Sequence, residues 1–161
     1  MIIRREKHSD YKAIYDLVKD AFPTEAEAKL IDQLRIDGTA VISMVAVIDN
    51  NLVGHIMMSK MSAPFRALGL GPLAVAATHR QKGIGGRLIV SALEEAKKEK
   101  WQCVFVLGNP AFYKKFGFDP ETASGFKCRY SGPDLMALAI EMPLPVASGN
   151  ILYASAFDNL D

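Results

Sequence analysis

A glycine-rich run, RQKGIGG, occupies residues 80–86 directly before an apolar pattern of helical spacing. The apolar segment upstream of it, residues 68–75, is typical of a strand. Glycines allow the backbone to come close to a ligand, and the first amides of a helix have no intrahelical acceptor. The helix dipole adds partial positive charge at the same place. We therefore predict that this junction binds a phosphate group.

Other phosphate-binding signatures do not fit the loop. The P-loop requires Gly-Lys followed by Ser or Thr, with a glycine five residues earlier, and no window of the chain supplies it. The dinucleotide fingerprint fails because Leu88 stands where its last glycine belongs. A looser match at residues 69–74 lies inside the apolar strand, contains Pro72 and opens no helix. A plain glycine-rich turn that caps a surface helix remains an alternative interpretation.

Length and composition favour one globular domain over residues 1–161. Half of the 161 residues are hydrophobic and 23% are charged, which is sufficient for a core without disulfides or a structural metal. The net charge of +1 provides no overall field that would attract nucleic acid or an anionic membrane. We expect neither as a partner.

The cysteines and the N-terminus indicate the compartment. Cys103 and Cys128 are too few and too far apart for a zinc site, so we expect no metal and two reduced thiols, with Cys103 filling a strand position in the core. The first residues carry charges where a signal peptide needs apolar residues, and no apolar run approaches the length of a membrane span. The expected location is the cytoplasm.

The elements that would position the loop follow from hydrophobic periodicity and turn signals. A first helix is expected to be capped by Ser9 and stopped by Pro23, and Thr24 and Glu27 form a capping box for a second helix. The predicted strands lie at residues 2–5, 43–48, 52–60, 68–75, 103–107 and 135–142. Four helices are predicted. The first two end near residues 22 and 37, and the other two span residues 83–100 and 109–116. Residues 143–161 carry the aromatic anchors Tyr153 and Phe157, which would pack on the domain or on a partner subunit in a homodimer.

A right-handed crossover would make the strands at 68–75 and 103–107 parallel neighbours. The glycine loop then lies at the carboxyl end of the first of them, where ligands bind in open α/β sheets. The predicted fold class is a mixed α/β sheet flanked by helices.

These features resemble the GNAT N-acetyltransferase superfamily over nearly the whole chain. Arg80, Gly83 and Gly85 match its Arg-x-x-Gly-x-Gly pyrophosphate motif. The runs EAKLIDQLR at 27–35, GPLAV at 71–75 and GNPAFYKKFGF at 108–118 are similar to the YhbS-like branch. That branch usually has Asp where this chain has Asn109, so the substitution removes one carboxylate from the cleft.

The resemblance implies a splayed central sheet, with acetyl-CoA in the slot between two strands. Gly71 and Pro72 supply a physical reason, because Pro72 donates no ladder hydrogen bond and Gly71 tolerates unusual dihedral angles. An alternative is that these two residues merely end the strand early. The resemblance implies cofactor contacts at Leu73, Ala74, Val75, Arg80, Gln81, Lys82, Gly83, Ile84, Gly85, Gly86, Asn109 and Tyr113.

The chemistry implied by the resemblance is attack of a primary amine on the thioester of acetyl-CoA. The backbone amide of Leu73 would donate to the carbonyl oxygen as it gains charge. Tyr113 would donate to the departing sulfur, unless its ring, between Phe112 and Phe116, serves only as core.

The general base is less clear, because residues 68–75 contain no carboxylate or imidazole. Glu25, Glu27 and His55 are candidates. The first two also fit as favourable charge at a helix start, and His55 as a polar strand residue. His79 fits a surface position or the adenine side of the cofactor.

The predicted function is transfer of an acetyl group from acetyl-CoA to an amine of a small molecule or a protein. A catalytically silent acyl-CoA-binding module is the alternative, since the cofactor loop is clear while the base is not. A nucleotide-binding domain is disfavoured by the missing Lys-Ser pair. The acceptor itself cannot be read from these residues.

Overall fold

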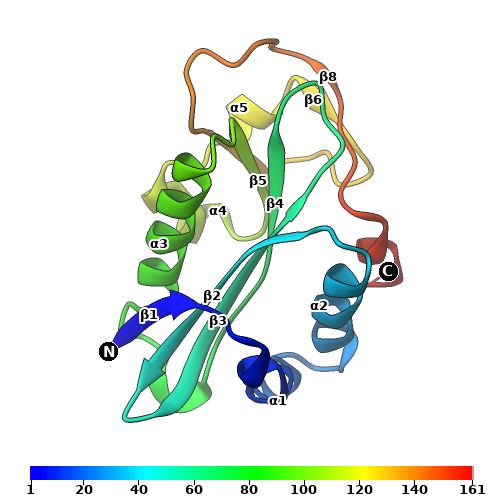
Figure 1. Ribbon diagram of the computed structural model, residues 1–161. Helices are drawn as coiled ribbons and strands as arrows, with labels where there is room; N and C mark the ends of the chain where they lie inside the picture. The colour runs from blue at the N-terminus through cyan, green and yellow to red at the C-terminus, as the bar shows by residue number, and fades with distance from the viewer. Residues whose placement is uncertain (161) are drawn as a thin grey trace.

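A six-stranded sheet in the order β1-β2-β3-β4-β5-β7 forms the centre of the computed structural model, which describes residues 1–160 (Figure 1). Neighbouring strands are antiparallel except β4 and β5, which run parallel. This confirms the predicted crossover. The strands are β1 (Ile2–Arg5), β2 (Ala40–Ile48), β3 (Asn51–Lys60), β4 (Ala67–Val75), β5 (Cys103–Leu107) and β7 (Leu135–Ala139).

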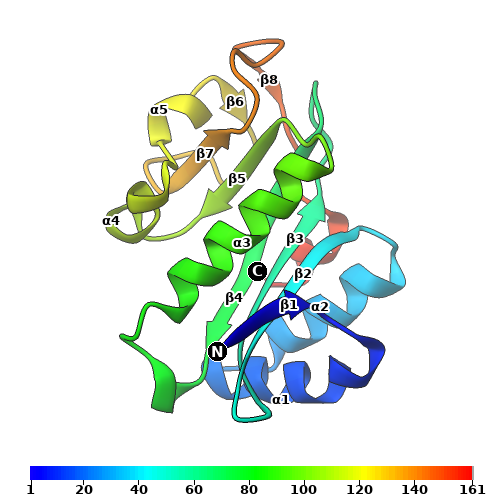
Figure 2. The ribbon, with the colours of Figure 1, turned by 60° about the vertical axis from the view of Figure 1, so that its left-hand side comes forward.

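Helices cover both faces of this sheet. Helices α1 (Tyr11–Ala21) and α2 (Ala26–Ile36) lie on one face, and α3 (Ile84–Lys98) lies on the other (Figures 1 and 2). The shorter elements are α4 (Pro110–Tyr113), α5 (Pro120–Ala123), the 3-10 turns His8–Asp10, Ala77–His79, Lys114–Phe116 and Ser155–Leu160, and a separate parallel pair, β6 (Phe126–Lys127) with β8 (Gly149–Asn150). In the described part of the chain, none of the helices combines the length and the apolar character that crossing a membrane requires.

The hydrophobic core has one layer on each side of the sheet because the strands are buried on both faces. Leu88 and Ile89 of α3 pack with Ile56 of β3 in the first layer. Ile14 of α1 and Ile31 of α2 pack with other apolar side chains in the second. Cys103 is fully buried in a third cluster beneath β5 and β7, as expected of a small core residue.

The structure corrects several predicted boundaries. Ser9 does not cap α1. It lies inside a 3-10 turn in which the Lys7 amide donates to Asp10 Oδ2 at 2.7 Å. The predicted capping box before α2 does not form, because the N-cap residue is Glu25 and not Thr24. Thr24 Oγ1 accepts from the Ala26 amide at 3.2 Å in a local turn.

The last strand of the sheet is shorter than predicted. β7 ends at Ala139 because the amides of Ile140 and Glu141 both donate to the Gln102 carbonyl, which turns the chain away from β5.

Strand β4 contains a bulge at Gly71-Pro72. Leu70 pairs with Met58 of β3 and Leu73 pairs with Ile56, so that two residues of β4 lie opposite one residue of β3. Gly71 has a φ of 149°, which side-chain-bearing residues rarely adopt. The strand continues to Val75, so the alternative of an early strand end is wrong.

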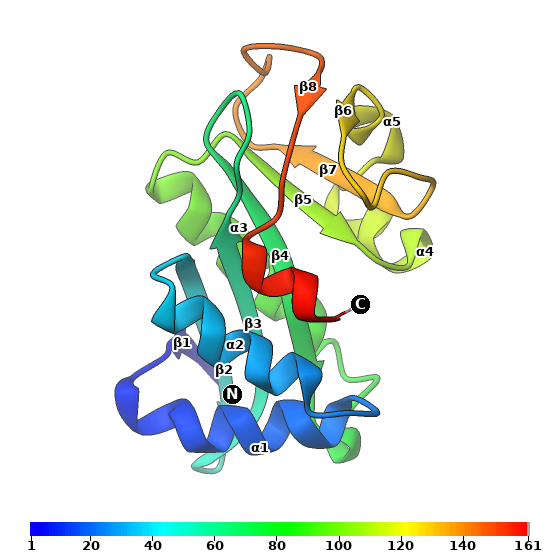
Figure 3. The same ribbon diagram turned by 90° about the vertical axis from the view of Figure 1, so that its right-hand side faces the viewer.

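The C-terminal segment packs on this domain rather than extending away from it. The 3-10 turn Ser155–Leu160 lies beside α2 (Figure 3), and Phe157 belongs to the α1 and α2 core layer. The Tyr153 ring lies against β4 at Gly69, where an added Cβ would stand 2.7 Å from Tyr153 Cε2. The absence of a side chain at Gly69 therefore allows the C-terminal segment to pack against β4 through Tyr153.

Replacing Gly54 with valine should destabilise the fold, because side chains of α3 leave no room for a Cβ at this residue of β3. A Cβ at Gly54 would lie 2.9 Å from Leu88 Cδ1 and 3.2 Å from Ile84 Cγ2. We expect Gly54→Val to lower the free energy of unfolding by roughly 1–3 kcal/mol, and Gly54→Ala by less. Urea denaturation followed by circular dichroism measures both. Equal stability of Gly54→Val and the parent would contradict this packing.

Candidate functional site

The N-terminus of α3 opens with unpaired backbone amides. Gly83 is the N-cap residue, in the left-handed region with a φ of 78°. The first backbone bond of the helix runs from the Arg87 amide to the Gly83 carbonyl at 3.1 Å. The amides of Ile84, Gly85 and Gly86 are thus left without an intrahelical acceptor and are free for an anion.

The glycines of this loop serve different purposes. Gly83 needs its positive φ, and a Cβ there would meet no atom within 4 Å. A Cβ at Gly86 would stand 2.9 Å from Phe116 Cζ, so this glycine lets α3 approach the turn after α4. Gly85 would accept a Cβ at ordinary contact distances from Val75, Phe112 and Leu73.

The remaining residues of the motif border the same loop. Arg80 Nε donates to the Val75 carbonyl at 3.3 Å and so ties the loop to the end of β4. Gln81 has a φ of 63°, which bends the chain toward the helix. Lys82 is exposed. The structure therefore groups all seven residues of the run at one end of β4.

Strands β4 and β5 separate at the bulge. Their pairing runs from Ala67 with Cys103 to Leu70 with Val106 and stops there. Figure 3 shows the two strands diverging beyond this point. The edge of β4 that faces β5 is consequently unpaired from Gly71 onward.

The orientation of the β4 amides follows from one hydrogen bond. The Ala76 amide donates to the Val53 carbonyl of β3 at 2.8 Å. Because amides alternate between the two edges of a strand, those of Leu73 and Val75 face the opening. Ala74, predicted with them, has its backbone toward β3 and a buried side chain in the α1 and α2 core layer.

A cavity of about 300 Å³ lies at this opening and brings the two predicted catalytic residues, Leu73 and Tyr113, together. Its walls come from α2, β4, β5, α4, the C-terminal segment, the residue that follows α1 and the turn after β6. The lining residues are Phe22, Glu27, Leu30, Leu70, Gly71, Pro72, Leu73, Leu107, Tyr113, Tyr130, Tyr153, Phe157 and Leu160.

Tyr113 has a fixed ring and a hydroxyl that stays protonated. Its ring makes edge contacts with Phe112 and Phe118. An added Cβ at Gly108 would stand 2.6 Å from Tyr113 Cε2, so the preceding loop passes close beneath the ring. Burial raises the pKa of Tyr113 above its ordinary value of 10.0, which leaves the phenol as a hydrogen-bond donor at neutral pH.

Asn109 uses its side chain within the fold. Its Oδ1 accepts from the Ala111 amide at 3.0 Å and caps α4, which Pro110 begins. Asn and Asp are both favoured at this position, so exchanging one for the other preserves the cap. In this structure Asn109 positions the helix that carries Tyr113.

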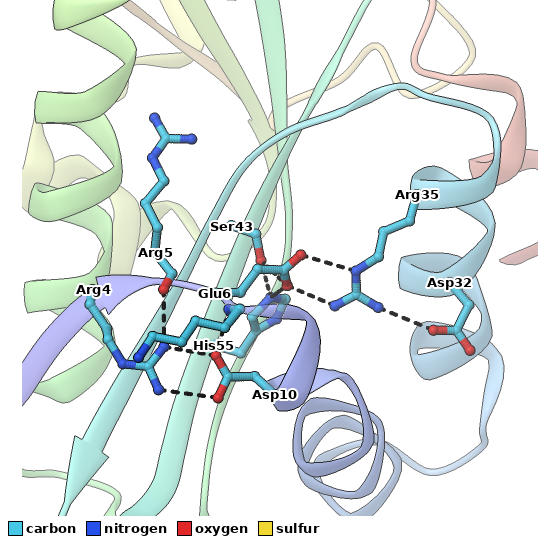
Figure 4. A network of polar contacts seen from close by, with 9 residues as sticks. Arg4, Arg5, Glu6, Asp10, Asp32, Arg35, Ser43 and His55 are labelled. Atoms are coloured by element: carbon cyan, nitrogen blue, oxygen red, sulfur yellow. Dashed lines mark hydrogen bonds and ion pairs between the residues drawn. The ribbon is translucent and has the colours of Figure 1, made fainter.

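His55 does not reach the cavity, contrary to its candidacy as a base. It is fully buried on β3, and its Nε2 lies 2.7 Å from Ser43 Oγ (Figure 4). Ser43 Oγ donates to Glu6 Oε1 at 2.6 Å, so Nε2–H of a neutral imidazole donates to Ser43. Burial lowers the pKa of His55, which agrees with a neutral ring.

Glu6 also joins α2 to the sheet. Arg35 of α2 donates to its two carboxylate oxygens at 2.7 and 3.1 Å, a bidentate pair in which both side chains are largely buried. Burial alone would raise the pKa of Glu6, but the contacts with His55, Arg35 and Ser43 lower it to about 2. This network fixes α2, and with it one wall of the cavity.

The other candidate residues differ in whether they line the cavity. Glu25 is exposed and lies 3.9 Å from Lys19 Nζ. His79 is half-buried at the loop, where its Nδ1 lies 2.9 Å from Thr78 Oγ1. Glu27 lines the cavity. Sequence reasoning did not place Tyr130, Tyr153 and Phe157 there, because each is distant in sequence from the loop and β4 motifs.

A family model described as the Acetyltransferase (GNAT) family matches residues 11–118. The curated protein Uncharacterized N-acetyltransferase YhbS of Escherichia coli K12 is 32% identical over 138 residues, which cover 83% of each protein. Uncharacterized N-acetyltransferase YjhQ of the same strain is 33% identical over 135 residues, with 78% of this chain and 74% of YjhQ covered.

Two solved structures resemble the whole chain. Escherichia coli YhbS in complex with CoA superposes with a TM-score of 0.92 at 28% identity, covering 98% of this chain and 91% of that one. A GNAT family acetyltransferase from Brucella melitensis in complex with acetyl-CoA superposes with a TM-score of 0.81 at 27% identity. This match covers 98% of this chain and 97% of that one.

Removing the Glu6 charge should change how stability depends on pH. The folded-state pKa of about 2 lies below the ordinary 4.5, so Glu6 stabilises the fold above pH 4.5 and loses this effect as the pH falls toward 2. We expect Glu6→Gln to cost roughly 2 kcal/mol near neutral pH, after allowance for solvent screening. The difference from the parent should shrink in acid.

Urea denaturation over a series of pH values measures this difference. Glu94→Gln is the matched control, because Glu94 is exposed on α3. It should track the parent at every pH. A Glu6→Gln difference that stayed constant down to the lowest pH would show that the network does not hold the Glu6 carboxylate ionised.

Proposed function

Since the chain belongs to the acetyltransferase (GNAT) family, we propose that it transfers the acetyl group of acetyl-CoA to a primary amine. The separation of β4 from β5 at Leu70 carries the proposal, because it leaves unpaired amides beside a cavity that also contains Tyr113. The complexes of YhbS with CoA and of the Brucella melitensis protein with acetyl-CoA support the same co-substrate.

The loop at 80–86 would hold the diphosphate of CoA. The free amides of Ile84, Gly85 and Gly86 and the helix dipole supply positive potential without a charged side chain. From this loop the pantetheine arm would follow the unpaired edge of β4, whose Leu73 and Val75 amides face the opening. The thioester then reaches the cavity on the α1 and α2 face.

The reaction needs a neutral amine and a stabilised carbonyl oxygen. An ammonium acceptor first loses one proton, and its nitrogen then bonds to the thioester carbonyl carbon while the carbon–sulfur bond breaks. A second proton leaves the nitrogen and one proton goes to the sulfur. The products are an amide, the CoA thiol and one proton. A Leu73 amide aimed at the carbonyl oxygen would stabilise the charge that develops there.

Tyr113 is proposed to serve the departing sulfur. A phenol with a pKa of ~10 gives a proton to the thiolate of a thiol with a pKa of ~8.5 at a cost of about 2 kcal/mol. Burial raises the pKa of Tyr113 further, so complete transfer becomes more costly and hydrogen bonding to the sulfur is favoured. The hydroxyl is needed in either case.

A silent acyl-CoA-binding module would share the cofactor loop and differ in turnover. Acetyl-CoA should stabilise the protein against heat under both proposals. Release of CoA thiol with a panel of primary amines is expected only of the transferase. Retained tight binding without release across the panel would favour the module.

Valine at Gly83 should weaken binding of CoA. The φ of 78° suits glycine or asparagine but not a β-branched residue, so valine must distort the loop that presents the amides. Isothermal titration calorimetry should show affinity reduced roughly tenfold for Gly83→Val and much less for Gly83→Asn.

Gly38 offers the matched control for this experiment. Its φ of 73° and its empty surroundings equal those of Gly83, but it lies after α2. Gly38→Val should destabilise the protein to a similar extent and leave CoA affinity unchanged. Equal CoA affinity in Gly83→Val and the parent would exclude the loop as the phosphate site.

Replacing Tyr113 with phenylalanine should separate binding from turnover. The ring contacts remain while the hydroxyl is lost, so we expect CoA affinity within about twofold and a kcat lower by roughly tenfold to hundredfold. Thiol release and calorimetry measure the two quantities. Tyr15→Phe on α1 is the control and should leave both unchanged. An unaltered kcat in Tyr113→Phe would remove this hydroxyl from the reaction.

A further inference from the structure

The cavity beside the proposed thioester position has a chemical character of its own. Apart from the β4 residues, Tyr113 and Glu27, its walls are aromatic and aliphatic side chains around a volume suited to a ring or a branched hydrocarbon. These residues are Phe22, Leu30, Leu107, Tyr130, Tyr153, Phe157 and Leu160. A small polar molecule would leave this surface exposed to water.

One carboxylate interrupts the apolar lining. Glu27, in the first turn of α2, is the one charged side chain among the described residues that line the cavity. Its Oε1 is buried, and no donor within residues 1–160 bonds to it. The Glu27 carboxylate thus has no counter-ion among the described residues, although it lines an apolar cavity. An unpaired carboxylate beside apolar walls is costly, so its place is explained best by a cationic ligand that pairs with it.

The neighbouring carboxylate shows that helix charge alone does not account for Glu27. Glu25 also stands at the start of α2, where negative charge is favourable. It points outward and pairs loosely with Lys19 at 3.9 Å. Glu27 instead turns one oxygen inward, away from solvent and from any cation of the described chain.

A second unpartnered polar atom lies within the wall of this cavity, shielded from solvent. The Tyr153 hydroxyl is buried, and none of the described residues bonds to it. Its ring is held by edge contacts with Tyr130 and Phe157. Burial raises the pKa of Tyr153, so it remains a phenol that can both donate and accept. The cavity thus has one carboxylate among tyrosine rings and apolar side chains.

A long acyl chain on CoA is the competing occupant of this space. A hydrocarbon chain would cover the aromatic walls, but it would leave the Glu27 carboxylate without a counter-ion. An ammonium group on an apolar body satisfies the carboxylate and covers the walls together. The negative charge of Glu27 therefore favours an amine over an acyl chain as the occupant of the cavity.

We infer that the acceptor is a primary amine carried on an aromatic or bulky hydrocarbon body, and that Glu27 holds its ammonium group in the cavity beside Leu73 and Tyr113. This inference rests on the proposed transferase function. Glu27 receives the first ammonium proton and passes it to solvent. The amine nitrogen then bonds to the acetyl carbon, its second proton is released, and the sulfur leaves with one proton as the CoA thiol.

Steady-state thiol release with acetyl-CoA tests the acceptor class. Phenethylamine should exceed ethylamine in kcat/KM by roughly tenfold or more, because burying the ring gains that much free energy. Glu27→Gln should raise KM for phenethylamine roughly tenfold or more, since the ammonium loses its charged partner. Glu25→Gln is the matched control and should equal the parent.

Calorimetry in the presence of CoA tests Glu27 without turnover. Phenethylamine should bind the parent protein and lose roughly tenfold or more in affinity with Glu27→Gln. Phenethyl alcohol, its neutral analogue, should bind both proteins within about twofold of each other, because it carries no charge for Glu27. CoA affinity should be the same in both proteins.

These outcomes distinguish the acceptor inference from the transferase proposal. Glu27-dependent binding of phenethylamine without thiol release would support the acceptor site and contradict transfer. Thiol release that does not favour phenethylamine over ethylamine, or that is indifferent to Glu27→Gln, would support transfer and overturn the inference. Tighter binding of octanoyl-CoA than acetyl-CoA, strengthened by Glu27→Gln, would assign the cavity to an acyl chain and also overturn it.

Discussion

Strand β4 keeps one neighbour and loses the other, and the site depends on this difference. Beyond Leu70 it remains paired with β3 across a bulge, while β5 turns away. Pairing on one edge holds the backbone of β4 in place beyond the bulge, so that the directions of its amides are fixed. The absence of pairing on the other edge leaves the Leu73 and Val75 amides available. A strand paired on both edges would offer no donors, and an unpaired one would not hold them in place.

The elements around this opening are fixed by interactions away from it. Arg80 ties the glycine loop to the Val75 carbonyl, and Asn109 caps the short helix that presents Tyr113. Arg35 holds α2 to the sheet through Glu6, and α2 carries Glu27 into the cavity. Preorganisation of this kind matters for the proposed reaction, because hydrogen-bond donors stabilise developing charge only at short distance.

The buried network around His55 has a structural role, unlike the carboxylate that lines the cavity. An imidazole between Ser43 and the core is neutral and shielded, so it supports Glu6 instead of taking a proton from an acceptor. Glu6 in turn stays ionised because Arg35 and Ser43 donate to it. The polar groups of this network stabilise the frame, and the unpartnered carboxylate of Glu27 lies at the cavity.

Local patterns in the sequence determined the elements that depend on neighbouring residues. The periodicity of residues 84–96 defined α3, the apolar run at 103–107 defined β5 within its observed bounds, and the Gly71-Pro72 pair predicted the bulge. Each rests on backbone geometry that a few adjacent residues impose. The glycine loop at 80–86 was readable for the same reason.

Only the tertiary structure decided which side chains meet at the cavity. Glu27, Tyr113 and Tyr153 come from three separate parts of the chain, and no local spacing relates them. Their meeting follows from the crossover of α3, the return of the C-terminal segment over Gly69 and the attachment of α2 to the sheet. Burial and orientation, which separate Glu27 from Glu25 and from His55, are products of that packing. The sequence shows which residues are charged. Their exposure depends on the segments that pack over them in the folded chain.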